Sequence, residues 1–192
     1  MKIKQYNFIR GESMSGRSMT ALSMVKYLNN TTIYFDFNFS SSNYNKNQYL
    51  NNKNKNMCVI SMNRKYSEVL KYLTNINKDC YNRLDIVFDS IDELEDDFTE
   101  FIDLLPKNHR YFFITKNRTF KKENNWESSE IVSYHDSYLL PINSISVFDM
   151  IKNEDGILLY SLNTKESYYI GDISQAIRNM KINEMLSNDS EN

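Results

Sequence analysis

The sequence predicts an α/β fold of three layers, with a mostly parallel central sheet, helices on both faces and an antiparallel strand extension near the C-terminus. Apolar strand-like segments alternate with amphipathic helical segments through the first two thirds of the chain. Such alternation is typical of parallel strands joined by helical crossovers, whereas the consecutive strands expected afterwards favour antiparallel pairing. The length of 192 residues and a hydrophobic content of 41% fit one globular domain.

The first part of the chain contains five strand-like runs and three helical ones. The strands are expected where β-branched, aromatic or other apolar residues cluster, at 4–10, 32–37, 57–61, 84–89 and 110–115. Helices are expected at 18–29, 64–76 and 91–105, the last of them stopped by Pro106. The inward positions expected from the helical spacing are Met19, Leu22, Val25 and Leu28 in the first helix, and Val69, Leu70, Leu73 and Ile76 in the second.

The later part of the chain changes character. Short strands are expected at 131–135, 145–151, 156–162 and 166–170, with a turn at 153–156 that ends on a glycine. A last helix is expected at 172–186 and a disordered tail at 187–192, so that residues 1–186 form the single domain. Residues 38–56 are expected to be a polar loop or a weak helix, and residues 117–129 a polar, locally basic insertion.

Composition and charge narrow the function. The net charge of −2 and the pI of about 5.8 leave no overall basic surface for nucleic acid, although a local patch remains possible. The polar N-terminus has no signal-peptide core and no run reaches the ~20 apolar residues of a membrane span, so we expect a cytoplasmic protein. Cys58 and Cys80 are too few for a disulfide scaffold and are expected to be small buried hydrophobes, and His109 and His135 show no zinc spacing.

One motif carries specific chemistry. Residues 11–18 read G-E-S-M-S-G-R-S, which matches the phosphate-loop pattern G-x-x-x-x-G-K-[ST] except that arginine replaces lysine. The glycines let the backbone turn tightly, so that successive N–H groups form an anion-binding nest at the start of the next helix. The expected phosphate-binding residues are Gly11, Glu12, Ser13, Met14, Ser15, Gly16, Arg17 and Ser18. The alternative is a chance turn before a helix, with Ser18 as an ordinary N-cap.

A second motif is the apolar strand at 84–89 (L-D-I-V-F-D), which ends in an acid. Phosphate-loop enzymes place an Asp at this point to hold Mg²⁺, and the hydroxyl of the loop's last residue is another ligand. We therefore expect Ser18 and Asp89 to form the metal site. Alternatives are a strand-end turn residue at this position, or Asp92 as the metal-binding acid.

Together with these motifs, several segments resemble the RecA-like P-loop core of recombinases and hexameric replicative helicases. The resemblance covers residues 4–172 and rests on GESMSGRS, IYFDF, LDIVFD, RYFFITK and SISVFDMIKNEDGILLYSLNTK. It implies that Asp36 is the catalytic acid that polarises water and that Thr115 or Lys116 is a sensor at the end of the next strand. It also implies that Lys165 is the nearest candidate for a basic residue that reaches the nucleotide of a neighbouring subunit.

Two positions depart from the family pattern in ways that bear on hydrolysis. Arg17 stands where the family has lysine, and a planar, forked guanidinium does not replace a compact ammonium closely. Asp36 stands where the family usually has glutamate, so its carboxylate reaches less far toward an attacking water. Asp36 and Arg17 remain the expected catalytic residues, with hydrolysis expected to be weak or conditional.

The insertion after the fifth strand interleaves basic and aromatic residues. Single-stranded nucleic acid is bound by such charges combined with stacking platforms, and in RecA-like cores this loop faces the channel of a ring or filament. The candidate nucleic-acid contacts are Lys116, Arg118, Phe120, Lys121, Lys122 and Trp126. An equally good interpretation is a solvated insertion with Trp126 packed against the sheet.

These observations predict an ATP-binding protein of nucleic-acid metabolism that uses Mg²⁺ and hydrolyses ATP weakly or conditionally. Single-stranded DNA, further copies of the chain, or a helicase or recombinase are the expected partners, and a membrane is not. The main alternative is a catalytically degenerate NTPase-like subunit that binds a helicase or recombinase as a structural or regulatory protein. A small nucleotide or nucleoside kinase is less compatible, because the sequence lacks an arginine-rich lid.

Overall fold

The fold is built on one mixed β-sheet. The computed structural model describes residues 1–12, 15–37, 56–61, 65–79, 82–91, 98–116 and 142–189. In chain order the strands are β1 (Tyr6–Arg10), β2 (Thr32–Asp36), β3 (Met57–Ser61), β4 (Asp85–Asp89), β5 (Arg110–Thr115), β6 (Ile145–Asn153), β7 (Gly156–Ser161) and β8 (Glu166–Tyr169). The α-helices are α1 (Arg17–Leu28), α3 (Tyr66–Asp79), α4 (Phe98–Leu104) and α6 (Ile173–Asp189), and the 3-10 turns are η3 (Ile142–Ser144) and η4 (Ile170–Asp172).

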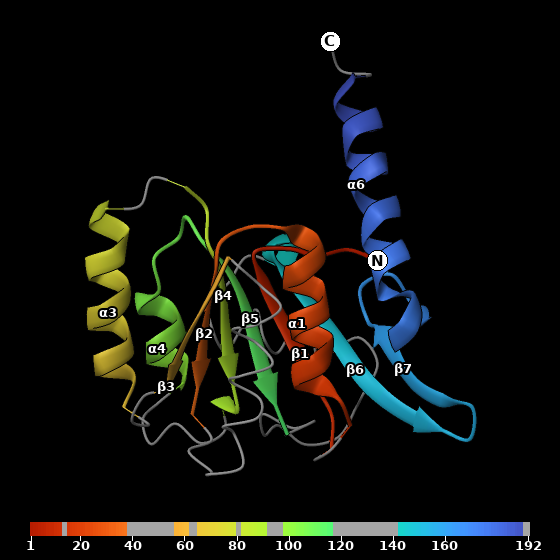
Figure 1. Ribbon diagram of the computed structural model, residues 1–192, viewed down its shortest axis with the longest axis horizontal. Helices are drawn as coiled ribbons and strands as arrows, with labels where there is room; N and C mark the ends of the chain where they lie inside the picture. The colour runs from red at the N-terminus through yellow and green to blue at the C-terminus, as the bar shows by residue number, and fades with distance from the viewer. Residues whose placement is uncertain are drawn as a thin grey trace.

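The strand order is β3-β2-β4-β5-β1-β6-β7-β8. The first six strands in this order, β3 through β6, pair with their neighbours in parallel. Strand β7 runs antiparallel to both β6 and β8. The expected α/β class, with a mostly parallel sheet flanked by helices and an antiparallel extension, is therefore confirmed (Figure 1). The β6–β7 hairpin turns where the sequence predicts it, with Asn153 paired to Gly156 and a φ of 138° at the glycine.

One face of the sheet is an aromatic layer covered by α3 and α4. Aromatic rings from adjacent strands stack, with centroids 4.9 Å apart for Phe8 and Phe113 and 5.5 Å apart for Phe88 and Phe113. Val69 and Leu73 of α3 are fully buried against this layer, as expected from their helical spacing. Burial of large aromatic side chains is among the strongest hydrophobic contributions to a core, so this face anchors the fold.

The other face is covered by α1 and α6, as Figure 1 shows for the two helices beside β1 and β6. Ala21 and Val25 of α1 and Ile173 and Ile177 of α6 are buried in this layer. The ammonium of Lys181 donates to the carbonyl oxygens of Tyr27 at 2.8 Å and Leu28 at 3.1 Å. A cation at the C-terminal end of a helix satisfies carbonyls that lack intrahelical partners, so α6 fixes the far end of α1.

The structure corrects three expectations. Met19 is 46% exposed, because it precedes the buried Ala21 by two residues and so lies about 200° around the helix. Cys58 is exposed on β3, at the edge of the described sheet, and is not a buried hydrophobe. Helix α6 continues to Asp189, so residues 187–189, expected in the tail, are helical.

Several expectations lie outside the described residues. These include the polar segment at 38–55, Cys80, residues 92–97 of the expected acidic helix, and residues 117–141, which contain the basic and aromatic insertion, the expected strand at 131–135 and His135. Of the helix expected at 91–105, the described residues show the C-terminal part as α4, Phe98–Leu104.

Candidate functional site

The two expected acids and the start of α1 meet at one edge of the sheet. Parallel strands end at the same edge, and ligands of open α/β sheets bind there. Strand β1 leads at this edge into the loop that precedes α1, β2 ends at Asp36 and β4 ends at Asp89. Asp36 and Asp89 are direct partners in the β2–β4 register, and both lie on the sheet face that α1 covers, two residues beyond Tyr34 and Val87. The sheet therefore brings two carboxylates next to the N-terminus of α1.

The loop between β1 and α1 has the features expected of an anion-binding turn. Gly16 is in the left-handed region, with a φ of 84°, and forms the N-cap of α1 without a side-chain hydrogen bond. The first turn of α1 contains no acidic residue. The Oγ atom of Ser15 is buried and has no hydrogen-bond partner among the described groups. The N–H groups of a helix's first turn have no intrahelical acceptor, and together with the buried hydroxyl of Ser15 they match the needs of a bound phosphate.

The two glycines of the loop are needed for different reasons. A Cβ atom on Gly11 would lie 2.8 Å from both the Cβ of Met150 and the Oγ of Ser15, so the loop packs there without space for a side chain. A Cβ atom on Gly16 would lie 3.5 Å from the Cδ1 of Ile170 and 3.8 Å from the Cδ1 of Ile157, which are ordinary contacts. Position 16 therefore requires glycine because of its φ and not because of crowding. Ser13 and Met14 lie outside the described residues.

The loop and the acidic strand are joined by a direct hydrogen bond. The Ser18 hydroxyl donates to Oδ2 of Asp89 at 2.8 Å, although the two residues are 71 positions apart. The hydroxyl of Tyr34 donates to the same carboxylate oxygen. Burial and the neighbouring Asp89 charge raise the pKa of Tyr34 well above its usual value, so this hydroxyl keeps its proton. Ser90, which follows Asp89, holds a left-handed φ of 64° and contributes a long contact of 3.4 Å to Oδ1.

This arrangement fits a Mg²⁺ ion bound together with phosphate. A hydroxyl has one hydrogen and two lone pairs, so donation to Asp89 leaves the lone pairs of Ser18 available to a cation. Magnesium is usually held by one or two carboxylates together with the phosphates of a substrate. No group of three or more metal-binding His, Cys, Asp or Glu residues occurs among the described residues, so a cation here would depend on such added ligands.

The two expected catalytic residues differ in how far they are exposed to solvent. Arg17 is the first residue of α1 and is half-buried. Asp36 is only 1% exposed at the end of β2, beside Asp89. The structure thus brings Asp36 to the site, but encloses its carboxylate.

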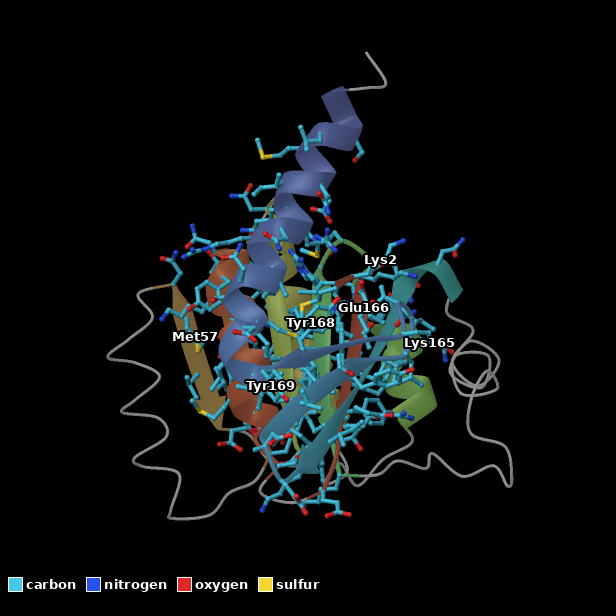
Figure 2. The ribbon with its side chains drawn as sticks, turned by 90° about the vertical axis from the view of Figure 1, so that its right-hand side faces the viewer. Lys2, Met57, Lys165, Glu166, Tyr168 and Tyr169 are labelled. Atoms are coloured by element: carbon cyan, nitrogen blue, oxygen red, sulfur yellow. The ribbon has the colours of Figure 1, made fainter. Side chains whose placement is uncertain are left out.

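Strand β5 brings the expected sensors to the same edge of the sheet, whereas the basic residue for a neighbouring subunit lies away from it. Thr115 is buried at the end of β5 and shares its sheet face with Phe113, away from α1, while Lys116 is exposed. Lys165 lies in the turn between β7 and β8, with a φ of 57°. Because β7 runs antiparallel, this turn lies toward the start of β6, away from the phosphate-loop edge, and Figure 2 shows Lys165 and Tyr169 at opposite ends of β8.

The sequence did not single out two polar contacts near the loop. Arg10, the last residue of β1, is 1% exposed and forms a bidentate ion pair with Asp149 of β6, in which Nε to Oδ1 and Nη2 to Oδ2 both measure 2.8 Å. Tyr34 is the other missed residue. Charged residues inside two apolar strands are a signal for such a pair, since buried charges are rarely left alone.

The remaining candidates for nucleic-acid contact, Arg118, Phe120, Lys121, Lys122 and Trp126, lie outside the described residues. In the part of the chain that the structure describes, no helix combines the length and apolar character of a membrane span. Neither a protein-family model nor a curated protein matches this sequence.

Proposed function

We propose that this protein binds ATP with Mg²⁺ through the loop at residues 11–18, as a RecA-like P-loop protein of nucleic-acid metabolism. The observation that carries the proposal is the hydrogen bond of 2.8 Å from Ser18 to Asp89. It joins the two motifs that the sequence nominates, one at the helix start and one at the strand end. The strand–loop–helix context of residues 6–28 and the mostly parallel sheet also support it.

The chemistry follows from the residues at the site. Backbone N–H groups around Gly16 and the guanidinium of Arg17 bind the phosphate oxygens, and Ser18 with Asp89 holds Mg²⁺, which neutralises charge on the phosphates. Asp36 orients the attacking water. Hydrolysis is slow because Asp36 is short and enclosed, and because Arg17 does not present the compact charge of lysine.

A titration with a fluorescent ATP analogue, with and without Mg²⁺, tests this function. We expect Mg²⁺ to tighten binding, and unlabelled ATP to displace the analogue at a concentration at least about tenfold lower than AMP, because AMP lacks the β- and γ-phosphates that the nest and Arg17 bind. Absence of binding, or equal competition by AMP and ATP, would contradict a phosphate-binding loop.

A second candidate is a degenerate NTPase-like subunit that binds a helicase or recombinase. Two observations favour it: the enclosure of Asp36, and the exposed Ile182, Met185 and Leu186 on the part of α6 that projects from the body (Figure 1). Exposed apolar side chains that cluster often mark protein-binding surfaces. Phosphate release measured with and without single-stranded DNA separates the candidates, since nucleotide binding without turnover under both conditions supports the degenerate subunit.

A further inference from the structure

The side chain of Tyr34 lies directly under the proposed metal site. Tyr34 is fully buried on β2, on the same sheet face as Asp36 and Asp89, and precedes them by two positions in the register. Two residues of a strand rise about 6.6 Å, a span that a tyrosine side chain leaning along the strand can bridge. Its hydroxyl accordingly reaches the carboxylate of Asp89.

We propose that Tyr34 is a positioning residue of the metal–nucleotide site, which holds the Asp89 carboxylate in the orientation that accepts the hydrogen of Ser18. This inference rests on the proposed function. It adds a residue that neither phosphate-loop motif contains, and Tyr34 acts through Asp89 without touching the nucleotide.

The hydrogen-bond geometry explains the role. Oδ2 of Asp89 accepts from both Tyr34 and Ser18, so the two hydroxyl groups together fix the position of this oxygen. The terminal torsion of an aspartate has a broad minimum, so the carboxylate turns easily unless a partner holds it. With Oδ2 held, the hydrogen of Ser18 points at the carboxylate, and its lone pairs would remain available to a cation.

The surroundings of Tyr34 separate this role from ordinary packing. Apart from the carboxylates at the strand ends, the same face carries buried apolar residues, among them Val87, Phe112 and Ile114. A phenylalanine ring would fill this space as well as the tyrosine ring does. The hydroxyl is thus the part of Tyr34 that serves Asp89, and its removal tests the proposal without a large change in packing.

The experiment compares Tyr34→Phe with Tyr111→Phe. Tyr111 is a matched control, because it is also a buried tyrosine of the sheet, but its hydroxyl donates to the Pro106 carbonyl at 2.6 Å, away from the loop. For each variant, the Mg²⁺ concentration that gives half of the Mg²⁺-dependent gain in binding of the fluorescent ATP analogue is measured. Binding without Mg²⁺ and the melting temperature are measured in parallel.

We expect Tyr34→Phe to raise the half-saturating Mg²⁺ concentration about tenfold, within the range usual for residues that orient metal ligands. Binding of the analogue without Mg²⁺ stays within about twofold of wild type, because the nest and Arg17 are untouched. Tyr111→Phe leaves both quantities unchanged. A folded Tyr34→Phe protein with a wild-type Mg²⁺ requirement overturns the role of Tyr34 and leaves the proposed function intact, whereas a wild type that binds no analogue overturns both.

A measurement on the unmodified sequence covers the case in which Tyr34→Phe does not fold. In protein carrying ¹³Cζ-labelled tyrosine, the Tyr34 resonance is expected to shift when Mg²⁺ is added to the ATP complex, while the Tyr111 resonance stays in place. An unmoved Tyr34 resonance overturns the proposal. In the folded variants, Ser18→Ala and Tyr34→Phe should also be non-additive, since both act through Asp89.

Discussion

At the scale of single residues, Gly11 and Gly16 of the loop are required for different reasons, and substitutions can distinguish these reasons. Gly11 has no space for a Cβ, whereas Gly16 has space but an unfavourable φ for other residues. A Cβ atom on Gly171, by contrast, would have no other atom within 4 Å, and the φ of Gly171 is not in the left-handed region. Crowding by backbone-proximal atoms cannot be relieved by a rotamer change, so Gly11 is the more sensitive test of the loop.

We predict that Gly11→Ala lowers the free energy of unfolding by about 1 to 3 kcal/mol, the usual range for overpacking, and weakens analogue binding by displacing the loop. Gly171→Ala is the matched control and should change stability by less than about 0.5 kcal/mol, as surface substitutions usually do. Urea unfolding measures the first effect and the analogue titration the second. Wild-type stability and affinity in Gly11→Ala would mean that the contact with Met150 does not exist as described.

The burial of His109 predicts that the stability of the protein depends on pH. It is 1% exposed; its Nδ1 accepts from the Leu84 N–H at 3.3 Å, and its Nε2 is buried without a partner among the described groups. Burial, with a further contribution from Arg83, lowers the pKa of His109 below 6.5. The unfolded chain therefore takes up a proton before the folded protein does, so this contribution to stability is complete above about pH 6.5. It is lost as the pH falls from there toward the folded pKa.

His109→Gln keeps an acceptor for the Leu84 N–H and removes the titration. Urea unfolding at intervals between pH 7.5 and 5 is expected to give a shallower decline of stability in the variant than in wild type. Parallel declines would exclude His109 as the source of the acid sensitivity.

At the scale of elements, β6 is the support of the phosphate loop. It pairs with β1, holds Arg10 through Asp149, and places Met150 against Gly11. A bidentate pair between guanidinium and carboxylate is geometrically specific, so it fixes the end of β1 immediately before the loop begins. The ion pair faces the aromatic layer, on the opposite side of the sheet from α1, and the loop is thus anchored from both faces.

We predict that Asp149→Asn costs about 3 kcal/mol of stability, because it removes the charge of the carboxylate that forms the bidentate pair with the buried guanidinium of Arg10. Replacing both partners, as Arg10→Met with Asp149→Leu, should recover much of that loss, since an apolar pair carries no uncompensated charge. Urea unfolding of the single and double variants measures both. A loss below about 1 kcal/mol in Asp149→Asn would place this pair among the weak surface pairs.

The sequence predicts those features of elements that are local. The loop, α1 and Asp89 are recognisable because glycine spacing and an acid after an apolar strand are read along the chain. Tyr34 is not recognisable, because its contact with Asp89 depends on β2 lying beside β4. The expected burial of Cys58 is wrong for the same reason. The apolar run of β3 suggests burial, but the strand order places β3 at the edge of the described sheet.

The sequence predicts the buried face of a helix and the point where a helix ends less accurately. Met19 follows the correct helical period but lies on the outer side of α1, since the buried stripe is centred on Ala21 and Val25. The end of α6 could not be placed because Ser187, Asn188 and Asp189 have weak helix preferences, whereas the helix continues through them.

At the scale of the whole molecule, the proposed site and the projecting helix occupy opposite ends. The parallel strands end near the phosphate loop, while α6 extends beyond the other edge of the sheet with Met185 68% exposed (Figure 1). Nucleotide binding and docking of a protein partner would therefore not compete for the same surface. The net charge of −2 gives no overall attraction for nucleic acid, so any binding to single strands depends on local groups.

The central claim is that the nucleotide's phosphates bind at the start of α1, and amide NMR of the ¹⁵N-labelled full chain tests it most directly. During titration with ADP and Mg²⁺, we predict that the largest shifts occur at the amides of residues 15–19, with a further shift at Asp89 through Ser18. The amides of α6 beyond Lys181 should stay in place and serve as the internal control. Saturating ADP and Mg²⁺ that leave residues 15–19 unperturbed would contradict the account, whatever other residues respond.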